Sequence, residues 1–193
     1  MKCSLINLIV FVIIVNSDAN KPLFRPQLPI GEYRIKFLAV FRCESSNDQL
    51  QFNLYLSKTS VNTTEIKGNL TYLEPIDDSL NNEVNLAIKD TVNGWKDNAH
   101  VYKTAKACSS LKMLMGNSWT AIMESLGMNN ISCPIPVGCY KSSGIRLNKN
   151  FYANLPKQFF YGTYKSRIQF TKNKVVHGCT ISIIEVKRPW ETD

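Results

Sequence analysis

The chain has 193 residues, of which 44% are apolar and 20% are charged. This balance excludes an intrinsically disordered chain, and the length suits one domain with a sizeable core. The 23 basic residues outnumber the 15 acidic ones and give a net charge of +8, which favours anionic partners.

Residues 1–19 have the layout of a secretory signal peptide. Lys2 supplies a basic start, an apolar run extends to Val15, and Ser17 and Ala19 offer small residues for cleavage. The run is shorter than the roughly 20 residues that a transmembrane helix needs. We therefore expect a secreted, extracellular protein, a compartment in which nucleic acid is a poor partner.

In a secreted protein, cysteines can form disulfides and sequons can carry glycans. Five cysteines remain after cleavage, so at most two intrachain disulfides form and one thiol is left over. Three N-glycosylation sequons suit the same compartment. They begin at Asn62, Asn69 and Asn130.

The first half of the mature chain reads as a series of strands. Residues 20–32 hold three prolines and form an extended lead-in. Apolar residues then alternate over 33–41, 50–57, 66–73 and 84–89, and the first of these segments places Tyr33, Ile35, Phe37, Ala39 and Phe41 on one face. Asn93-Gly94 predicts a hairpin turn, and residues 100–106 a return strand.

The spacing changes to a helical period after Cys108. Trp119, Ile122, Met123 and Leu126 recur at i, i+3, i+4 and i+7, which predicts one or two short amphipathic helices over residues 109–127. The methionines here leave two interpretations open. The segment packs on the strands, or it forms a ligand mouth or a membrane contact.

The last third predicts a turn followed by a hairpin. Pro134 and Pro136 rule out a regular central strand within CPIPVGCY, residues 133–140. A short strand follows near residues 145–147, and residues 162–170 and 175–184 then pair across a TKNK turn. The pattern leaves open which face of the last strand is buried.

Together these segments predict an all-β fold. About eight short strands favour a single domain over residues 33–193, an antiparallel β-sandwich in the form of an immunoglobulin-like cup with a short helical segment at 109–127. No nucleophile-elbow, metalloprotease, dinucleotide or phosphate-loop motif occurs in the sequence. His100 and His177 are the only histidines, so we predict a protein that is not an enzyme and needs no metal or cofactor.

The C-terminal third resembles the ML-type lipid-recognition family, which includes ganglioside activator-like proteins and secreted arthropod relatives. The shared pattern is Cys-Pro, Gly and an aromatic, then a Gly-x-Tyr strand, a polar turn and Gly-Cys. Here it comprises Cys133-Pro134, Gly138, Tyr140, Gly162, Tyr164 and Gly178-Cys179. The resemblance implies a cup around an apolar ligand cavity and a function without catalysis.

The resemblance also implies a disulfide pattern. It pairs Cys43 with Cys179 and Cys108 with Cys133, and leaves Cys139 unpaired. A Cys133–Cys139 bridge with Cys108 free is the alternative.

Our hypothesis is a secreted carrier or presenter of a lipid or another apolar molecule, in lipid transport or chemosensory signalling. Trp119 and Met123 would gate the cavity, and Lys165 and Arg167 would favour anionic head groups, with an anionic membrane surface or a cell-surface receptor as partner. The alternative is a secreted glycoprotein with a filled core that acts through protein–protein interaction. The cavity candidates are Phe37, Phe52, Leu54, Leu70, Leu86, Trp119, Met123, Ile168 and Phe170.

Overall fold

Two layers of β-strands build the molecule. The computed structural model describes residues 29–43, 48–60, 63–147 and 154–192, and the expected signal peptide lies outside them. The predicted all-β sandwich with two short helices is confirmed. Among the described residues, no helix is long and apolar enough to cross a membrane.

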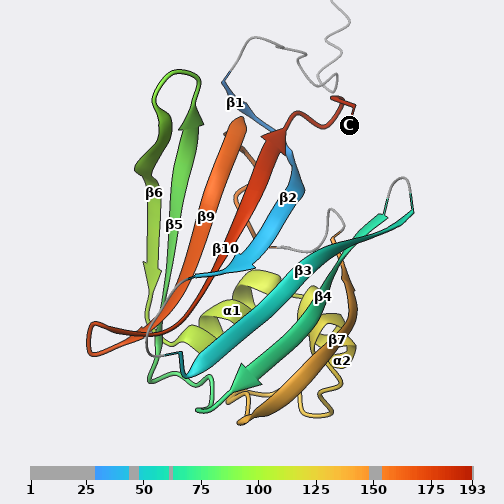
Figure 1. Ribbon diagram of the computed structural model, residues 1–193, viewed down its shortest axis with the longest axis vertical. Coiled ribbons are helices and arrows are strands. Elements are labelled where there is room, and N and C mark those ends of the chain that lie inside the picture. The colour runs from blue at the N-terminus through green and yellow to red at the C-terminus, as the bar shows by residue number, and fades with distance from the viewer. Residues whose placement is uncertain (1–28, 44–47, 61–62, 148–153, 193) are drawn as a thin grey trace, which may run out of the picture.

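The larger layer has five strands side by side (Figure 1). Neighbouring strands in it are all antiparallel. In order across the sheet they are β6 (Gly94–Thr104), β5 (Asn81–Asp90), β9 (Gly162–Lys172), β10 (Val175–Lys187) and β2 (Arg34–Arg42).

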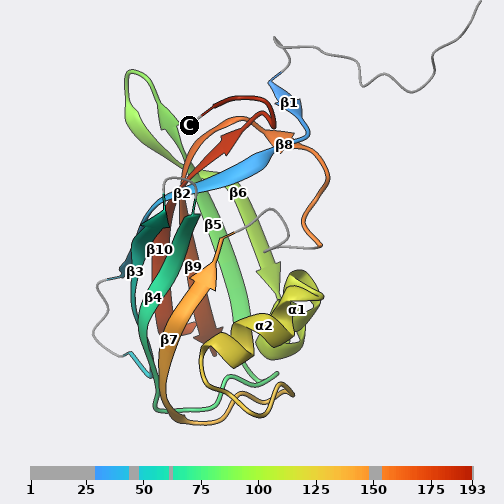
Figure 2. The ribbon, with the colours of Figure 1, turned by 90° about the vertical axis from the view of Figure 1, so that its right-hand side faces the viewer.

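The smaller layer has three strands. Its order is β3 (Leu50–Ser60), β4 (Thr63–Tyr72) and β7 (Gly138–Arg146). The helices α1 (Ala107–Met115) and α2 (Ser118–Ser125) lie on the open side between the layers (Figure 2). A separate short pair joins β1 (Ile30–Gly31) to β8 (Phe159–Phe160), so the end of the expected lead-in is extended.

The hairpin β9–β10 follows from its turn residues. Asn173 and Lys174 both adopt positive φ, 52° and 65°, as the two central residues of a type I′ turn require. The pairing then continues from Lys172–Val175 to Gly162–Val186. This hairpin holds the two longest neighbouring strands of the larger layer in a fixed register.

The predicted face of β2 is wrong beyond Phe37. Ile184 of β10 pairs with Phe37, but Ile183 pairs with Ala39, so Leu38 is an extra residue in β2. A bulge of this kind reverses which side chains face inward. Phe41, expected to face inward, is consequently 42% exposed.

The two layers are joined where β10 meets β3. Gly178 of β10 pairs in parallel with Leu50, the first residue of β3. A Cβ atom at position 178 would lie 2.5 Å from Leu50 Cβ and 2.7 Å from the Leu50 carbonyl oxygen. Only glycine allows this approach.

Two disulfides secure the sandwich. Cys43, just after β2, is bonded to Cys179 of β10, 136 residues away. Cys108 in α1 is bonded to Cys133, 25 residues away, and is fully buried. These are the two pairs that the resemblance implies.

The close contact at Gly178 predicts a large cost for a single methyl group. Gly178→Ala should lower the free energy of unfolding by about 3 kcal/mol, because one of the atoms it meets belongs to the backbone. Gly94→Ala is the control, since nothing lies within 4 Å of its Cβ and only its φ of 78° costs about 1 kcal/mol. Urea denaturation measures both, and equal costs would contradict the contact.

The disulfide between α1 and the segment before β7 should contribute strongly to stability. Replacing Cys108 and Cys133 together by Ala should lower the free energy of unfolding by about 3 kcal/mol on the loop-entropy model. Cys139→Ser, at an exposed position, should change it by no more than about 0.5 kcal/mol. A double variant as stable as the parent in denaturant titration would disprove this role.

Candidate functional site

An apolar pocket of about 350 Å³ lies on the inner face of the larger layer. The side chains of its floor come from all five strands of that layer. The apolar floor residues include Ile35, Val84, Leu86, Ile168, Ile184 and Val186. Its volume is at the lower end of the range typical of ligand sites.

The pocket exists because small side chains occupy the middle of its floor. Ser166 of β9 and Ser182 of β10 are direct cross-strand partners, and both line the pocket. Tyr164 and Ile168, on either side of Ser166 along the same face, are much larger. Two adjacent serines therefore leave a hollow that the neighbouring side chains do not fill.

The roof of the pocket is α1 together with the segment 154–156. The Tyr33 hydroxyl donates a 2.8 Å hydrogen bond to the Pro156 carbonyl, which holds this segment over β2. The backbone N–H of Asn154 donates to the Leu114 carbonyl at 3.2 Å, and its side-chain amide donates to the Met113 carbonyl. The roof is thus one hydrogen-bonded unit above the floor.

The start of α1 is fixed to the loop after β4. The Asp78 carboxylate accepts hydrogen bonds from the backbone N–H and the hydroxyl of Ser109, at 2.9 and 2.6 Å. The hydroxyl bond, followed by the backbone bond, holds the pKa of Asp78 below its usual value. The charged form of Asp78 is therefore the one that holds α1 in place.

The opening of the pocket lies between the edge strand β6 and the roof. Met113 of α1 is 68% exposed and Tyr102 of β6 is 46% exposed, although both line the pocket. Asn154 and Pro156 are exposed lining residues as well. A ligand can reach the floor from solvent at this place.

The electrostatics of the pocket are neutral. Among the described residues that line it, none is acidic, basic or histidine. Burial, followed by the nearby Tyr102, raises the pKa of Tyr33, so this phenol stays uncharged. The pocket is therefore suited to an uncharged apolar molecule.

Asn82 is a buried polar residue among those that line the pocket. Asn82 of β5 is only 6% exposed, and its side-chain oxygen Oδ1 is buried without a hydrogen-bond partner. Its backbone carbonyl accepts a 3.5 Å hydrogen bond from Thr104 of β6. Asn82 lies two residues before Val84 on the predicted inward face, so the alternation of β5 could have identified it.

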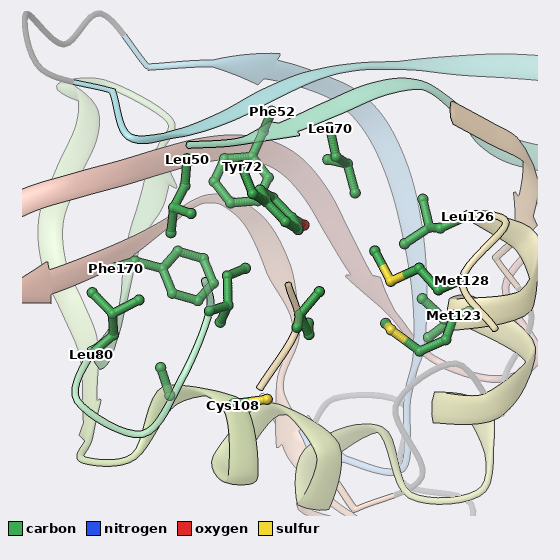
Figure 3. Close-up of a cluster of buried hydrophobic side chains, with 14 of the residues drawn as sticks. Leu50, Phe52, Leu70, Tyr72, Leu80, Cys108, Met123, Leu126, Met128 and Phe170 are labelled. Atoms are coloured by element: carbon green, nitrogen blue, oxygen red, sulfur yellow. The ribbon is translucent and has the colours of Figure 1, made fainter. Parts of the chain in front are cut away.

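The structure separates the nine cavity candidates into two groups. Phe37, Leu86 and Ile168 line the pocket. The other six lie in or against a filled core between β3, β4, the lower part of β9 and the helices (Figure 3). These six are Phe52, Leu54, Leu70, Trp119, Met123 and Phe170.

The filled half is closed by aromatic rings and by α2. Phe52 and Phe170 stack with ring centroids 5.6 Å apart, and Tyr72 meets Phe52 edge-on. Trp119 donates a 2.7 Å hydrogen bond from Nε1 to the Ile131 carbonyl, and Met123 is buried. The expected gate of Trp119 and Met123 is therefore wrong, because α1 roofs the pocket and α2 completes the core.

The expected basic rim is also misplaced. Lys165 and Arg167 alternate with the pocket residues Ser166 and Ile168, so they lie on the outer face of β9. The Lys165 Nζ is 3.7 Å from Asp97 Oδ1 and 5.5 Å from the Trp95 ring centroid. These cations do not face the pocket.

Neither histidine lines the pocket, although His100 of β6 is the cross-strand partner of the floor residue Leu86. His100 packs against Phe159 and Phe160, at centroid distances of 5.0 and 5.5 Å. His177 Nδ1 contacts the Glu74 carboxylate. Within the described ranges, no group of three or more histidine, cysteine, aspartate or glutamate side chains could hold a metal ion.

The remaining predicted sites are on the surface. Asn69 and Asn130 are exposed, as glycan attachment requires, and Asn62 lies outside the described residues. Cys139 is exposed and unpaired in β7, with its Sγ 3.8 Å from Thr71 Oγ1. Cys133 is bonded to Cys108, so the alternative Cys133–Cys139 bridge is not formed.

The fold and the pocket define a class of protein, a β-sandwich with one filled half and one hollow half. No family model matches the chain, and a search of curated proteins finds no match. The resemblance to lipid-recognition proteins consequently stays a prediction from the residues.

The disulfide pattern predicts one reactive thiol in residues 20–193. Protein purified from a eukaryotic secretion host should take up one maleimide per chain without denaturant, because Cys139 alone of the cysteines after residue 19 is free and exposed. Peptide mapping by mass spectrometry should place the label on Cys139, and Cys139→Ser should abolish it. Labelling of Cys108 instead would establish the alternative pairing.

Proposed function

We propose that this protein is a secreted carrier or presenter of an apolar or lipid molecule, which it binds in the pocket between the larger layer and α1 without catalysing a reaction. The observation that carries the proposal is the hollow half of the sandwich. A fully packed interior is the rule for protein cores, whereas this one keeps about 350 Å³ open under a roof. A hollow with almost wholly apolar walls favours the transfer of an apolar molecule out of water.

The volume bounds the size of the ligand. If each heavy atom of a chain needs about the 30 Å³ that a water molecule occupies in the liquid, the pocket accommodates about a dozen. A single short alkyl chain or a compact apolar molecule fits this space. A lipid with two long chains would have to leave much of its apolar surface outside.

The surroundings of the opening support exchange with an anionic surface. Met113 and Tyr102 are exposed at the opening, and Lys112 directly precedes Met113 in α1. Exposed apolar side chains beside basic ones suit contact with an anionic membrane. A cell-surface receptor is the other partner that this function would use.

Blocking the pocket should abolish binding. Ile184→Trp places an indole in the pocket and should weaken binding of the neutral fluorescent probe N-phenylnaphthylamine at least about tenfold, because the added ring occupies ligand volume. Ile183→Trp is the matched control. Ile183 directly precedes Ile184 in β10 and is also half-buried. Its side chain lies on the outer face of the sheet, as does that of its cross-strand partner Lys165.

Probe titration and native mass spectrometry check this prediction, with circular dichroism to confirm that both variants fold. Lipid that co-purifies with the parent and is lost from Ile184→Trp would support the carrier. A parent protein that is ligand-free and excludes the probe would instead support a glycoprotein that acts through protein–protein interaction.

A further inference from the structure

Two serine hydroxyl groups lie in the middle of the pocket floor. They belong to Ser166 of β9 and Ser182 of β10, which are direct cross-strand partners. Neither side-chain oxygen Oγ makes a hydrogen bond with a residue in the part of the chain that the structure describes. Polar groups inside a protein nearly always have a partner, because an unsatisfied one costs free energy. Both hydroxyls are therefore available to a ligand.

Both serine oxygens face the open space of the pocket. Among the described residues, fully buried side-chain oxygens without a partner occur only in Asp48 and Asn82. The serine oxygens lack a partner too but are not fully buried, so each borders open space. Ser166 is only 6% exposed and its side chain points to the inner face of the sheet, so the open space beside its Oγ is the pocket.

We propose that Ser166 and Ser182 form a specificity-determining subsite that binds the uncharged carbonyl oxygen of an otherwise apolar ligand. This inference rests on the proposed function and names the ligand class of the same pocket. The Cβ atoms of directly opposed residues are about 5 Å apart, so both hydroxyls can reach one atom between them. A carbonyl oxygen has two lone pairs and accepts both hydrogen bonds.

The pocket floor extends in both directions from the serine pair. Ser166 lies opposite Leu86 on β5, and Asn82, four residues before Leu86, lies toward one end of the floor. Val186, four residues after Ser182 on β10, lies toward the other end. Four residues of a strand span about 13 Å. A carbonyl group bound at the serines therefore leaves room for an apolar arm on either side.

The neutral walls of the pocket restrict the bound oxygen to an uncharged group. None of the described lining residues is acidic, basic or histidine. A carboxylate placed at the serines would lose its hydration without gaining a cation. An ionised fatty acid is consequently a poorer ligand than a ketone or an ester of the same length.

Three ligands of one chain length test the proposal. 6-Undecanone, undecanoate and undecane are titrated against the complex of the full mature protein with N-phenylnaphthylamine. We expect the ketone to displace the probe at about tenfold lower concentration than undecanoate, because only undecanoate must bury a charge. Infrared spectroscopy should show the C=O stretching frequency of the bound ketone below its value in hexane, because the oxygen accepts hydrogen bonds.

A double variant removes both hydroxyls and leaves the shape of the floor nearly unchanged. Ser166→Ala combined with Ser182→Ala should lower the affinity for 6-undecanone about tenfold and leave that for undecane within about twofold. It should also return the C=O frequency toward the value in hexane. The melting temperature of the ligand-free protein should not fall, because the change breaks no hydrogen bond within the described protein.

Thr180→Val is the matched control, because it removes a hydroxyl from the same strand outside the pocket. Thr180 lies two residues before Ser182 in β10 and is not among the described residues that line the pocket. Its hydroxyl donates a 3.4 Å hydrogen bond to the Phe41 carbonyl. This variant should leave all three affinities and the C=O frequency unchanged.

The outcomes distinguish this inference from the proposed function. If the ligands bind but the double variant changes the affinities for the ketone and undecane equally, or changes neither, the serines only make space and the inference is wrong while the carrier function stands. The same holds if the C=O frequency of the bound ketone equals that in hexane. If neither the probe nor any ligand binds, the proposed function fails and this inference fails with it.

Discussion

The crossing of β10 from one layer to the other is the constraint on which this structure depends. β10 pairs with β9 and β2 along most of its length and then meets β3 at Gly178. The approach is so close that the space for a Cβ atom is already occupied by Leu50. Cys179, the next residue, is bonded to Cys43 at the end of β2. The close approach at Gly178 thus holds β10 against β3, and the neighbouring disulfide ties β10 to the end of β2 within the larger layer.

The interior is filled at this crossing and open further along the larger layer. At the crossing, Phe52, Phe170 and Tyr72 are large enough to meet between the layers, and α2 closes what remains (Figure 3). On the inner face further along β9 and β10, the paired residues Ser166 and Ser182 are too short to reach α1. The space over the serines is roofed by α1 and residues 154–156 and stays open.

The sequence predicts the fold well because the fold depends on local signals. Alternation in β3 and β9, the helical period at residues 109–127 and the positive-φ residues Asn173 and Lys174 each act within a few positions. The face of β2 beyond Phe37 is missed because a bulge at Leu38 depends on the register with β10, which is a contact between distant segments.

The sequence predicts the site less well than the fold, because alternation alone does not separate a filled core from a pocket. Alternation tells which side chains point inward, and it correctly turns Phe37, Leu86 and Ile168 toward the pocket. It cannot tell whether the space ahead of an inward side chain is filled, since that depends on what lies opposite. Phe52 and Phe170 are inward too, but they meet each other and close the space.

Small and polar residues at inward positions are the better signal of a pocket. Large apolar side chains fill a core, so a list of inward phenylalanines and leucines indicates the filled half of a sandwich as readily as the hollow half. Serine and asparagine at inward positions bury little apolar surface, and their polar groups need hydrogen-bond partners. They therefore do not stabilise a core as large apolar side chains do. Ser166, Ser182 and Asn82 all lie on inward faces of strands, and all three line the pocket. In this sandwich, the departures from apolar alternation mark the site, and the alternation itself marks the scaffold.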